Sequence, residues 1–204
     1  MKELVWLDLC SGLGGASQPA LDRGWRVIRV DIESKFKPDI VADVRSLPLK
    51  PFHVDVLWAS PPCQEFSKRY LPWFSTKGLP DPPTELIECL QSAIKSLRPR
   101  YWIIENVRGA RKWLTPILGR VLFCSTGHAL WGQAPVLLPN IPPQKGSLGY
   151  QNGSRTKMGR RGGWAMGSGG GKDGHRRNSA TIAKIPYAIG EAICIAVERA
   201  ANGD

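Results

Sequence analysis

Short apolar runs alternate with amphipathic stretches along the first two thirds of the chain, from residue 4 to about residue 137. A helix is expected at 16–23, where Gly24 ends it. The apolar runs that predict strands in this part of the chain are 4–9, 26–31, 39–42 and 54–59. Strands that alternate with helices in this way are typical of an α/β fold with a mostly parallel sheet.

The clearest helix begins after Pro82-Pro83 and ends before Arg98-Pro99. Its apolar residues recur at helical spacing and are Leu86, Ile87, Leu90, Ile94 and Leu97. A buried strand is expected next at 101–105, and one or two more strands at 120–130. Together these elements predict a Rossmann-like α/β fold, with a mostly parallel sheet and helices on both of its faces.

Composition changes abruptly after Pro143. The segment 144–178 is crowded with glycine, arginine and lysine, so it cannot bury enough apolar surface to order itself. It is either a mobile basic loop or minimal subdomain, or a solvated linker without contacts. A closing amphipathic helix is expected at 186–197. The sequence therefore divides into a main domain at 1–143, the basic segment, and a C-terminal part at 179–204 that packs back on the main domain.

The formal net charge of +11 suits a protein that binds a polyanion, although basic proteins that never touch nucleic acid are common. The first apolar run is broken by Asp8, so neither a signal peptide nor a membrane span fits, and a soluble, cytoplasmic protein is expected. The five cysteines are scattered without neighbouring histidines. Neither a disulfide framework nor a metal site is therefore expected.

A glycine loop follows the first strand, in the sequence Asp8-Leu9-Cys10-Ser11-Gly12-Leu13-Gly14-Gly15. Glycines at such a turn let the backbone approach a ligand closely. A dinucleotide fingerprint requires a third glycine where this chain has Ser17, and Asp8 would repel a pyrophosphate. The loop therefore favours a cationic ligand without phosphate groups.

Two acids lie near the ends of the next two strands. Asp31 is placed to accept hydrogen bonds from the hydroxyls of a ribose, and Asp43 from the exocyclic amine of a base. Either residue could instead be an ordinary cap at the end of its strand. With the glycine loop, the two acids indicate an adenosine that carries a positive charge.

A cysteine follows the fourth strand, in the sequence Pro61-Pro62-Cys63-Gln64-Glu65-Phe66-Ser67. The two prolines hold the backbone extended, so the thiol is presented at the carboxyl edge of the sheet. Glu105 brings a carboxyl group to the same edge, unless it is a buried structural glutamate. A thiolate that adds to carbon 6 of cytosine, with an acid that supports charge on nitrogen 3, would make carbon 5 reactive.

With residues 8–15, Pro61-Pro62-Cys63-Gln64 and Glu105-Asn106-Val107 in this order, the chain resembles the cytosine-5 DNA methyltransferases, which use S-adenosylmethionine. The resemblance implies a class I methyltransferase fold in which 1–143 binds the cofactor and carries out catalysis, with S-adenosylhomocysteine as a product. The residues that it implies for cofactor binding are Asp8, Cys10, Ser11, Gly12, Gly14, Asp31, Ile32, Asp43, Val44 and Pro61.

The resemblance also implies double-stranded DNA as the partner, with the target cytosine flipped out of the helix. Cys63 would attack carbon 6, Glu105 would protonate or hydrogen-bond nitrogen 3, and Asn106 would brace the loop of Cys63. The basic segment 144–178 would recognise the target sequence. The residues assigned to nucleic-acid contact are Gln64, Ser67, Arg69, Asn106, Arg155, Arg160, Arg161 and Arg176.

Two features depart from the family pattern. A Gln-x-Arg-x-Arg strand should follow Glu105, but 119–130 offers only Arg120, so the arginine that holds the cytosine is left unassigned, with Arg160 and Arg161 as candidates. The recognition segment is also much shorter than usual. The alternatives are the same chemistry on RNA, a catalytically silent nucleic-acid-binding protein, and a nicotinamide-dependent oxidoreductase. A restriction-modification system is one setting that the resemblance suggests, and the oligomeric state is left open.

Overall fold

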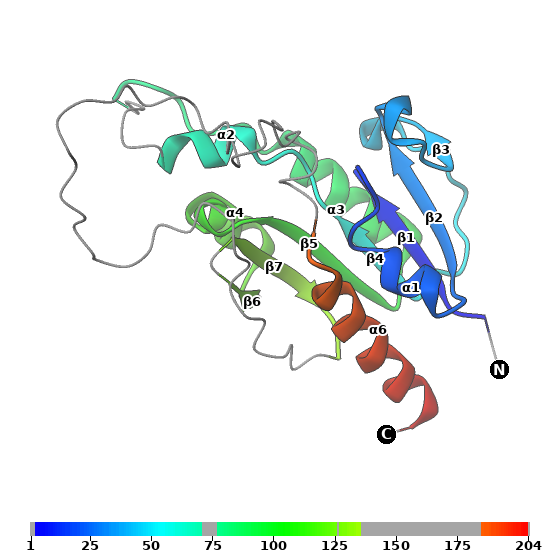
Figure 1. The fold of residues 1–204 in the computed structure, drawn as a ribbon. Helices are drawn as coiled ribbons and strands as arrows, with labels where there is room; N and C mark the ends of the chain where they lie inside the picture. Colours follow the sequence, from blue (N-terminus) through cyan, green and yellow to red (C-terminus); the bar gives the residue numbers. More distant parts are fainter. Residues whose placement is uncertain (1–2, 71–76, 126, 136–184, 204) are drawn as a thin grey trace, which may run out of the picture.

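The computed structural model describes residues 3–70, 77–125, 127–135 and 185–203. In this part of the chain, seven strands form one sheet in the order β3-β2-β1-β4-β5-β7-β6 (Figure 1). The strands are β1 (Val5–Leu9), β2 (Arg26–Asp31), β3 (Ile40–Val41), β4 (Val56–Ala59), β5 (Tyr101–Val107), β6 (Val121–Cys124) and β7 (His128–Gln133). The basic segment 144–178 and its two boundaries lie outside the described residues.

Most of the sheet is parallel. The pairs β1–β2, β2–β3, β1–β4 and β4–β5 are all parallel, whereas β7 runs antiparallel to both β5 and β6. The chain moves outward from β1 through β2 to β3 and then returns to the other side of β1 with β4. Because the strand order reverses here, the loops after β1 and β4 lead to opposite sides of the sheet. Open α/β sheets bind ligands at such a reversal point.

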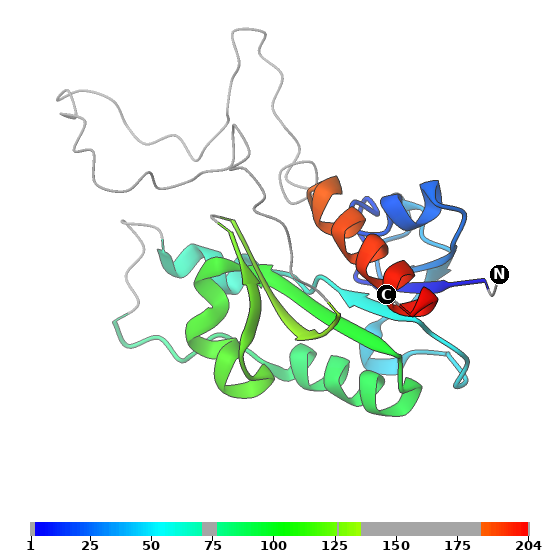
Figure 2. The same cartoon turned by 90° about the horizontal axis from the view of Figure 1, so that it is seen from below.

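Helices cover both faces of the sheet, as the sequence predicted (Figure 2). One face packs against α1 and α6, which also contact each other, and the other packs against α3 and α4. The α-helices are α1 (Gln18–Asp22), α2 (Gln64–Ser67), α3 (Glu85–Leu97), α4 (Arg111–Leu118) and α6 (Tyr187–Asn202). Short 3-10 helices are η1 (Ser34–Phe36), η2 (Val44–Ser46), η3 (Lys68–Tyr70) and η4 (Arg108–Ala110).

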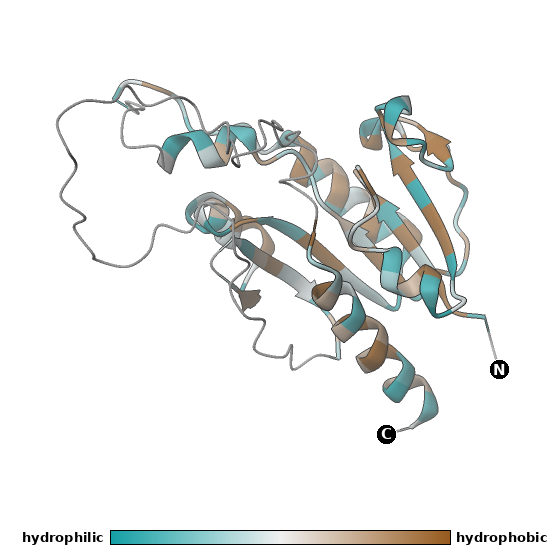
Figure 3. Cartoon of the chain, viewed as in Figure 1, coloured by the Kyte–Doolittle hydropathy of each residue, from teal (hydrophilic) through white to brown (hydrophobic). Residues whose placement is uncertain are grey.

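The central strand β1 shows why both faces must be covered, because all five of its residues are buried. Trp6 packs in the core that α6 closes with Ile189, and Leu7 packs in the core that α3 closes with Leu90. Successive side chains of a strand point to opposite faces, so a run that is apolar at both positions requires two helical layers. In Figure 3, α6 accordingly carries hydrophobic and hydrophilic residues on different sides.

The structure extends the sequence prediction at three elements. Helix α4 was not predicted, because Pro116 lies inside it and proline is unfavourable in a helix interior. Strand β5 runs to Val107, two residues beyond the prediction, since its end pairs with β7. Helix α6 continues to Asn202. Among the described residues, none of the helices combines the length and apolar character that a membrane span requires.

Candidate active site

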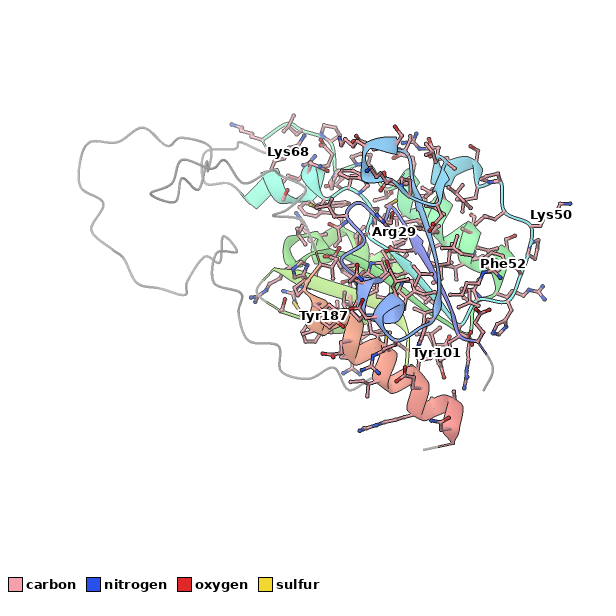
Figure 4. All side chains as sticks on the ribbon, turned by 45° about the vertical axis from the view of Figure 1, so that its right-hand side comes forward. Arg29, Lys50, Phe52, Lys68, Tyr101 and Tyr187 are labelled. Carbon is pink, nitrogen blue, oxygen red and sulfur yellow. The ribbon has the colours of Figure 1, made fainter. Side chains whose placement is uncertain are left out.

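The loop after β1 is held against β2. Cys10, Gly12 and Gly14 all have positive φ angles, of 55°, 48° and 69°. Arg29, labelled in Figure 4, donates from Nη2 to the carbonyl oxygen of Gly12 at 2.6 Å. A Cβ atom on Gly14 would lie 2.8 Å from Nε of the same arginine. Glycine at this position therefore serves both the backbone conformation and the close approach of β2.

Three carboxyl groups surround this loop. Burial raises the pKa of Cys10 to about 12, and the charges of Asp31, Asp8 and Asp43 add to the effect in that order. All three acids that the sequence assigned to the cofactor therefore act on one point of the loop. A field of this sign attracts a cation and repels a phosphate.

Asp31 and Asp43 also hold the backbone. Asp31 accepts hydrogen bonds from the amide of Gly12 at 2.7 Å and from the amide of Glu33 at 2.8 Å. Asp43 accepts from the amide of Arg45 at 2.9 Å and pairs with its guanidinium at 3.1 Å, so it caps η2. The capping alternative and the binding role are compatible, because a carboxylate accepts several hydrogen bonds.

Other side chains of the cofactor set differ in exposure. Ile32, directly after Asp31, is 63% exposed, whereas Val44 and Pro61 are buried. Among the described residues, Oγ of Ser11 is buried without a hydrogen-bond partner. A buried hydroxyl group without a partner is unfavourable, so this oxygen is suited to a ligand that supplies one.

Asp8 lies inside the protein, with 1% of its surface exposed. It accepts a hydrogen bond from Oγ of Ser17 at 2.5 Å. Ser17 is the residue that interrupts the dinucleotide fingerprint, and here it ties the end of β1 to the start of α1. Burial raises the pKa of Asp8 to about 7, although the bond from Ser17 and the charge of Arg29 oppose the shift.

Asp8→Asn is expected to flatten the dependence of stability on pH. The folded protein keeps the proton of Asp8 up to about pH 7, whereas an unfolded aspartate releases it near 3.8. The free energy of unfolding should thus fall as the pH rises through this window, by up to about 1.4 kcal/mol per unit. Denaturant unfolding at intervals from pH 4 to pH 8 measures the slope. Asp22→Asn, at an exposed carboxyl group, is the control, and parallel profiles for wild type and Asp8→Asn contradict the expectation.

The loop after β4 carries Cys63 and is fixed from two sides. The amide of Ser60 donates to the carbonyl oxygen of Leu9 at 3.1 Å, which joins this loop to the end of β1. Nδ2 of Asn106 donates to the carbonyl oxygen of Pro61 at 3.2 Å, so the end of β5 braces the loop. The carbonyl oxygen of Cys63 accepts from the amides of Phe66 at 3.1 Å and Ser67 at 2.8 Å, the last two residues of α2. The loop that carries the thiol is therefore held by the ends of β1 and β5 as well as by β4, from which it continues.

Glu105 acts electrostatically on Cys63. Burial is the larger cause that raises the pKa of the Cys63 thiol, and the charge of Glu105 is the next, while a hydrogen bond with Ser67 lowers it. Cys63 is thus a protonated thiol at neutral pH in this state, close enough to Glu105 to sense its charge. Oε1 of Glu105 lies 2.9 Å from Nδ1 of His128, a residue that sequence reasoning missed.

The segment after Cys63 is anchored by Arg69 and Trp113. Arg69 donates to the carbonyl oxygens of Glu65 at 3.2 Å and Pro80 at 2.7 Å, and its guanidinium lies 5.8 Å from the ring centroid of Trp113. Nε1 of Trp113 donates to Asp81 at 3.0 Å. Arg69, assigned to nucleic acid from the sequence, thus also joins the two ends of the stretch 65–81.

The remaining residues assigned to nucleic acid are divided between two regions. Gln64 is exposed on α2, and Oγ of Ser67 donates to its carbonyl oxygen at 3.3 Å. Arg155, Arg160, Arg161 and Arg176 lie outside the described residues. Within the described part of the chain, no group of three or more histidine, cysteine or acidic side chains could hold a metal ion.

Residues 6–113 match the family model of the C-5 cytosine-specific DNA methylases. The chain is 33% identical over 116 residues to a protein of Frog virus 3 (isolate Goorha) named "Probable DNA (cytosine-5)-methyltransferase". That match covers 49% of this chain and 52% of the viral protein, so the chain spans about half the length of its relative.

Solved structures show weaker likenesses. An E. coli protein described as a "putative DNA modification methyltransferase encoded within prophage" is 24% identical, with a TM-score of 0.41 over 55% of this chain and 34% of its own. DNMT2 of Spodoptera frugiperda is 22% identical, with a TM-score of 0.37 over 56% and 39%. Because these TM-scores are low, the α/β fold follows from the strand order of the sheet and not from these likenesses. Because the family model spans more than half of the sequence and contains the loops of both Cys10 and Cys63, this chain belongs to the C-5 cytosine-specific DNA methylase family.

Proposed function

We propose that the protein transfers a methyl group from S-adenosylmethionine to carbon 5 of cytosine in double-stranded DNA, through a covalent bond between Cys63 and carbon 6. The observation that carries this proposal is the hydrogen bond from Asn106, the residue after Glu105, to Pro61 in the loop of Cys63, because it holds the loop of the thiol against the strand that carries the carboxyl group. Family membership supplies the reaction class, and the net charge of +11 suits a polyanionic substrate.

The residues around the loop after β1 fit the proposed cofactor. The carboxylates of Asp31 and Asp43 favour a positively charged ligand, which would also favour the ionised form of Asp8, and Ser11 offers a buried hydroxyl group without a partner among the described residues. Ile32 exposes an apolar surface that a purine ring could cover. When bound, S-adenosylmethionine would supply an electrophilic methyl group on a positively charged sulfur.

The side chains near the ends of β4 and β5 would each have a separate role in the reaction of the cytosine. Cys63 would lose its proton to solvent and form the bond from sulfur to carbon 6, while Glu105, in its protonated form, would protonate or hydrogen-bond nitrogen 3, so electron density would move to carbon 5. Asn106 keeps the loop of Cys63 in place through Pro61. Transfer of the methyl group to carbon 5 would release S-adenosylhomocysteine. A base would then remove the proton on carbon 5, and the bond from sulfur to carbon 6 would break to restore the thiolate. The cytosine must leave the helix for Cys63 to reach it.

A duplex that contains 5-fluorocytosine is expected to trap a covalent complex with the wild-type protein in the presence of S-adenosylmethionine, because fluorine at carbon 5 cannot leave as a proton. Denaturing electrophoresis detects the complex, and peptide mass spectrometry should place the adduct on Cys63. Cys63→Ser should form none. Cys124→Ser, at an exposed cysteine on β6, is the matched control and should form the complex normally. If no adduct formed across duplexes of varied sequence, the proposal would be wrong.

Further measurements separate this proposal from the same chemistry on RNA and from a catalytically silent binding protein. Parallel reactions with DNA and RNA substrates of equal sequence decide between the two polymers, since both present the same base. Binding of nucleic acid that is unchanged in Cys63→Ser, with no methyl transfer by the wild type, would favour a catalytically silent binding protein. If the wild type does methylate DNA, bisulfite sequencing of DNA from cells that express the protein would report the target sequence.

A further inference from the structure

Glu105 has a partner on the neighbouring antiparallel strand. Nδ1 of His128 lies 2.9 Å from Oε1 of Glu105. In the register of β5 and β7, His128 is opposite Val107, two residues beyond Glu105. Residues at this diagonal spacing share one face of the sheet, so a long side chain and a ring can meet. The antiparallel return of β7 therefore delivers an imidazole to the acid at the site.

The backbone around His128 is firmly held. Its amide donates to Oγ of Ser125 at 3.1 Å, and its carbonyl oxygen accepts from the amide of Ser125 at 2.8 Å. The amide of Arg108, just after β5, donates to the carbonyl oxygen of Gly127 at 3.2 Å. These bonds fix the start of β7 to the end of β5, so the ring approaches Glu105 from a defined position.

The pair is shielded from solvent but still open at one side. The side chain of Glu105 is 9% exposed and that of His128 is 20% exposed. No lysine or arginine of the described residues forms an ion pair with Glu105, and β7 itself contains no arginine. A carboxyl group has two oxygens, and His128 contacts Oε1, so Oε2 is left for the base.

We infer that His128 is a positioning residue for Glu105: a hydrogen bond from its Nδ1 holds Oε1 and directs the second oxygen, which carries the acidic proton when the base is bound, toward nitrogen 3 of the target cytosine. This inference rests on the proposed methyl transfer to cytosine. In this inference a histidine on β7 orients Glu105. The Gln-x-Arg-x-Arg motif of the family is missing from this part of the chain. The ring must carry hydrogen on Nδ1, because only then can this nitrogen donate to Oε1.

The test compares variants that keep or remove the donor. His128→Ala should lower the single-turnover rate of methyl transfer about 10- to 100-fold, because a misplaced acid loses its alignment with the base. The KM for S-adenosylmethionine should stay within about twofold. His128→Asn places an amide donor near the position of Nδ1 and should restore most of the rate. His53→Ala is the matched control, since His53 contacts Asp55 at 3.0 Å just before β4, at the other end of that strand.

The outcomes are distinct from those of the 5-fluorocytosine experiment. If the wild type forms the adduct but His128→Ala transfers methyl groups at the wild-type rate, the inference is overturned while the proposed function stands. If His128→Asn is as slow as His128→Ala, donation from Nδ1 is not the cause, and the inference is again overturned. Should His128→Ala fail to fold, His128→Leu retains the bulk without the donor, and its comparison with His128→Asn decides the question.

Discussion

Glu105→Gln is expected to lower the rate of methyl transfer by about 10²- to 10⁴-fold while making Cys63 react faster with an alkylating agent. The two effects have opposite signs because Glu105 does two things. An amide cannot donate an acidic proton to nitrogen 3, so the reaction slows. The same change removes a negative charge that, after burial, is the next cause of the raised pKa of Cys63. A lower pKa leaves more thiolate at neutral pH.

The reaction of Cys63 with iodoacetamide, followed by peptide mass spectrometry between pH 6 and pH 10, measures the second effect. The midpoint for alkylation should move to lower pH in Glu105→Gln. Glu88→Gln, on the exposed side of α3, is the control for loss of one carboxyl group and should leave both rates unchanged. Alkylation that is slower in Glu105→Gln than in the wild type would show that the two groups are not coupled as the structure indicates.

Gly190→Ala is expected to destabilise the protein by about 1–3 kcal/mol, because helix α6 lies directly on the backbone of the loop that leads into α1. A Cβ atom at this position would lie 2.1 Å from the carbonyl oxygen of Ala16 and 3.1 Å from Cγ of Pro19. Helix propensity alone predicts the opposite, a gain of about 1 kcal/mol for alanine over glycine. The sign of the change therefore reports whether α6 packs as the structure describes.

Denaturant unfolding of the wild type and the variant measures this difference. Ala188→Val is the matched control, since it adds methyl groups at an exposed position of the same helix and should change stability by less than about 0.5 kcal/mol. Because Ala16 follows the loop of Cys10 and Gly14, binding of S-adenosylmethionine should also weaken in Gly190→Ala. A variant that is more stable than the wild type would contradict the packing of α6 on α1.

The sequence by itself determined the fold class and the order of most elements. The apolar runs that predicted β1 and β4 are buried at every position, and that of β5 is buried in its middle, so their hydrophobicity required a sheet between two layers of helices. It also placed Cys63 and Glu105 at strand ends. Parallel strands bring their carboxyl ends to one edge, so two motifs about 40 residues apart could be predicted to meet there.

Only the tertiary structure decided which groups act on one another at that edge. The hydrogen bond from Ser17 to Asp8, the two bonds from Arg69 across 65–81, and the contact of His128 with Glu105 each give a residue that the sequence had singled out a partner that the sequence did not indicate. The contact of His128 with Glu105 depends on the register in which β7 pairs with β5. A shift of one residue would turn His128 to the other face of the sheet. Hydrophobic periodicity fixes which face of a strand is buried, whereas strand register and packing fix its neighbours, and these neighbours determine the pKa values and orientation of the site.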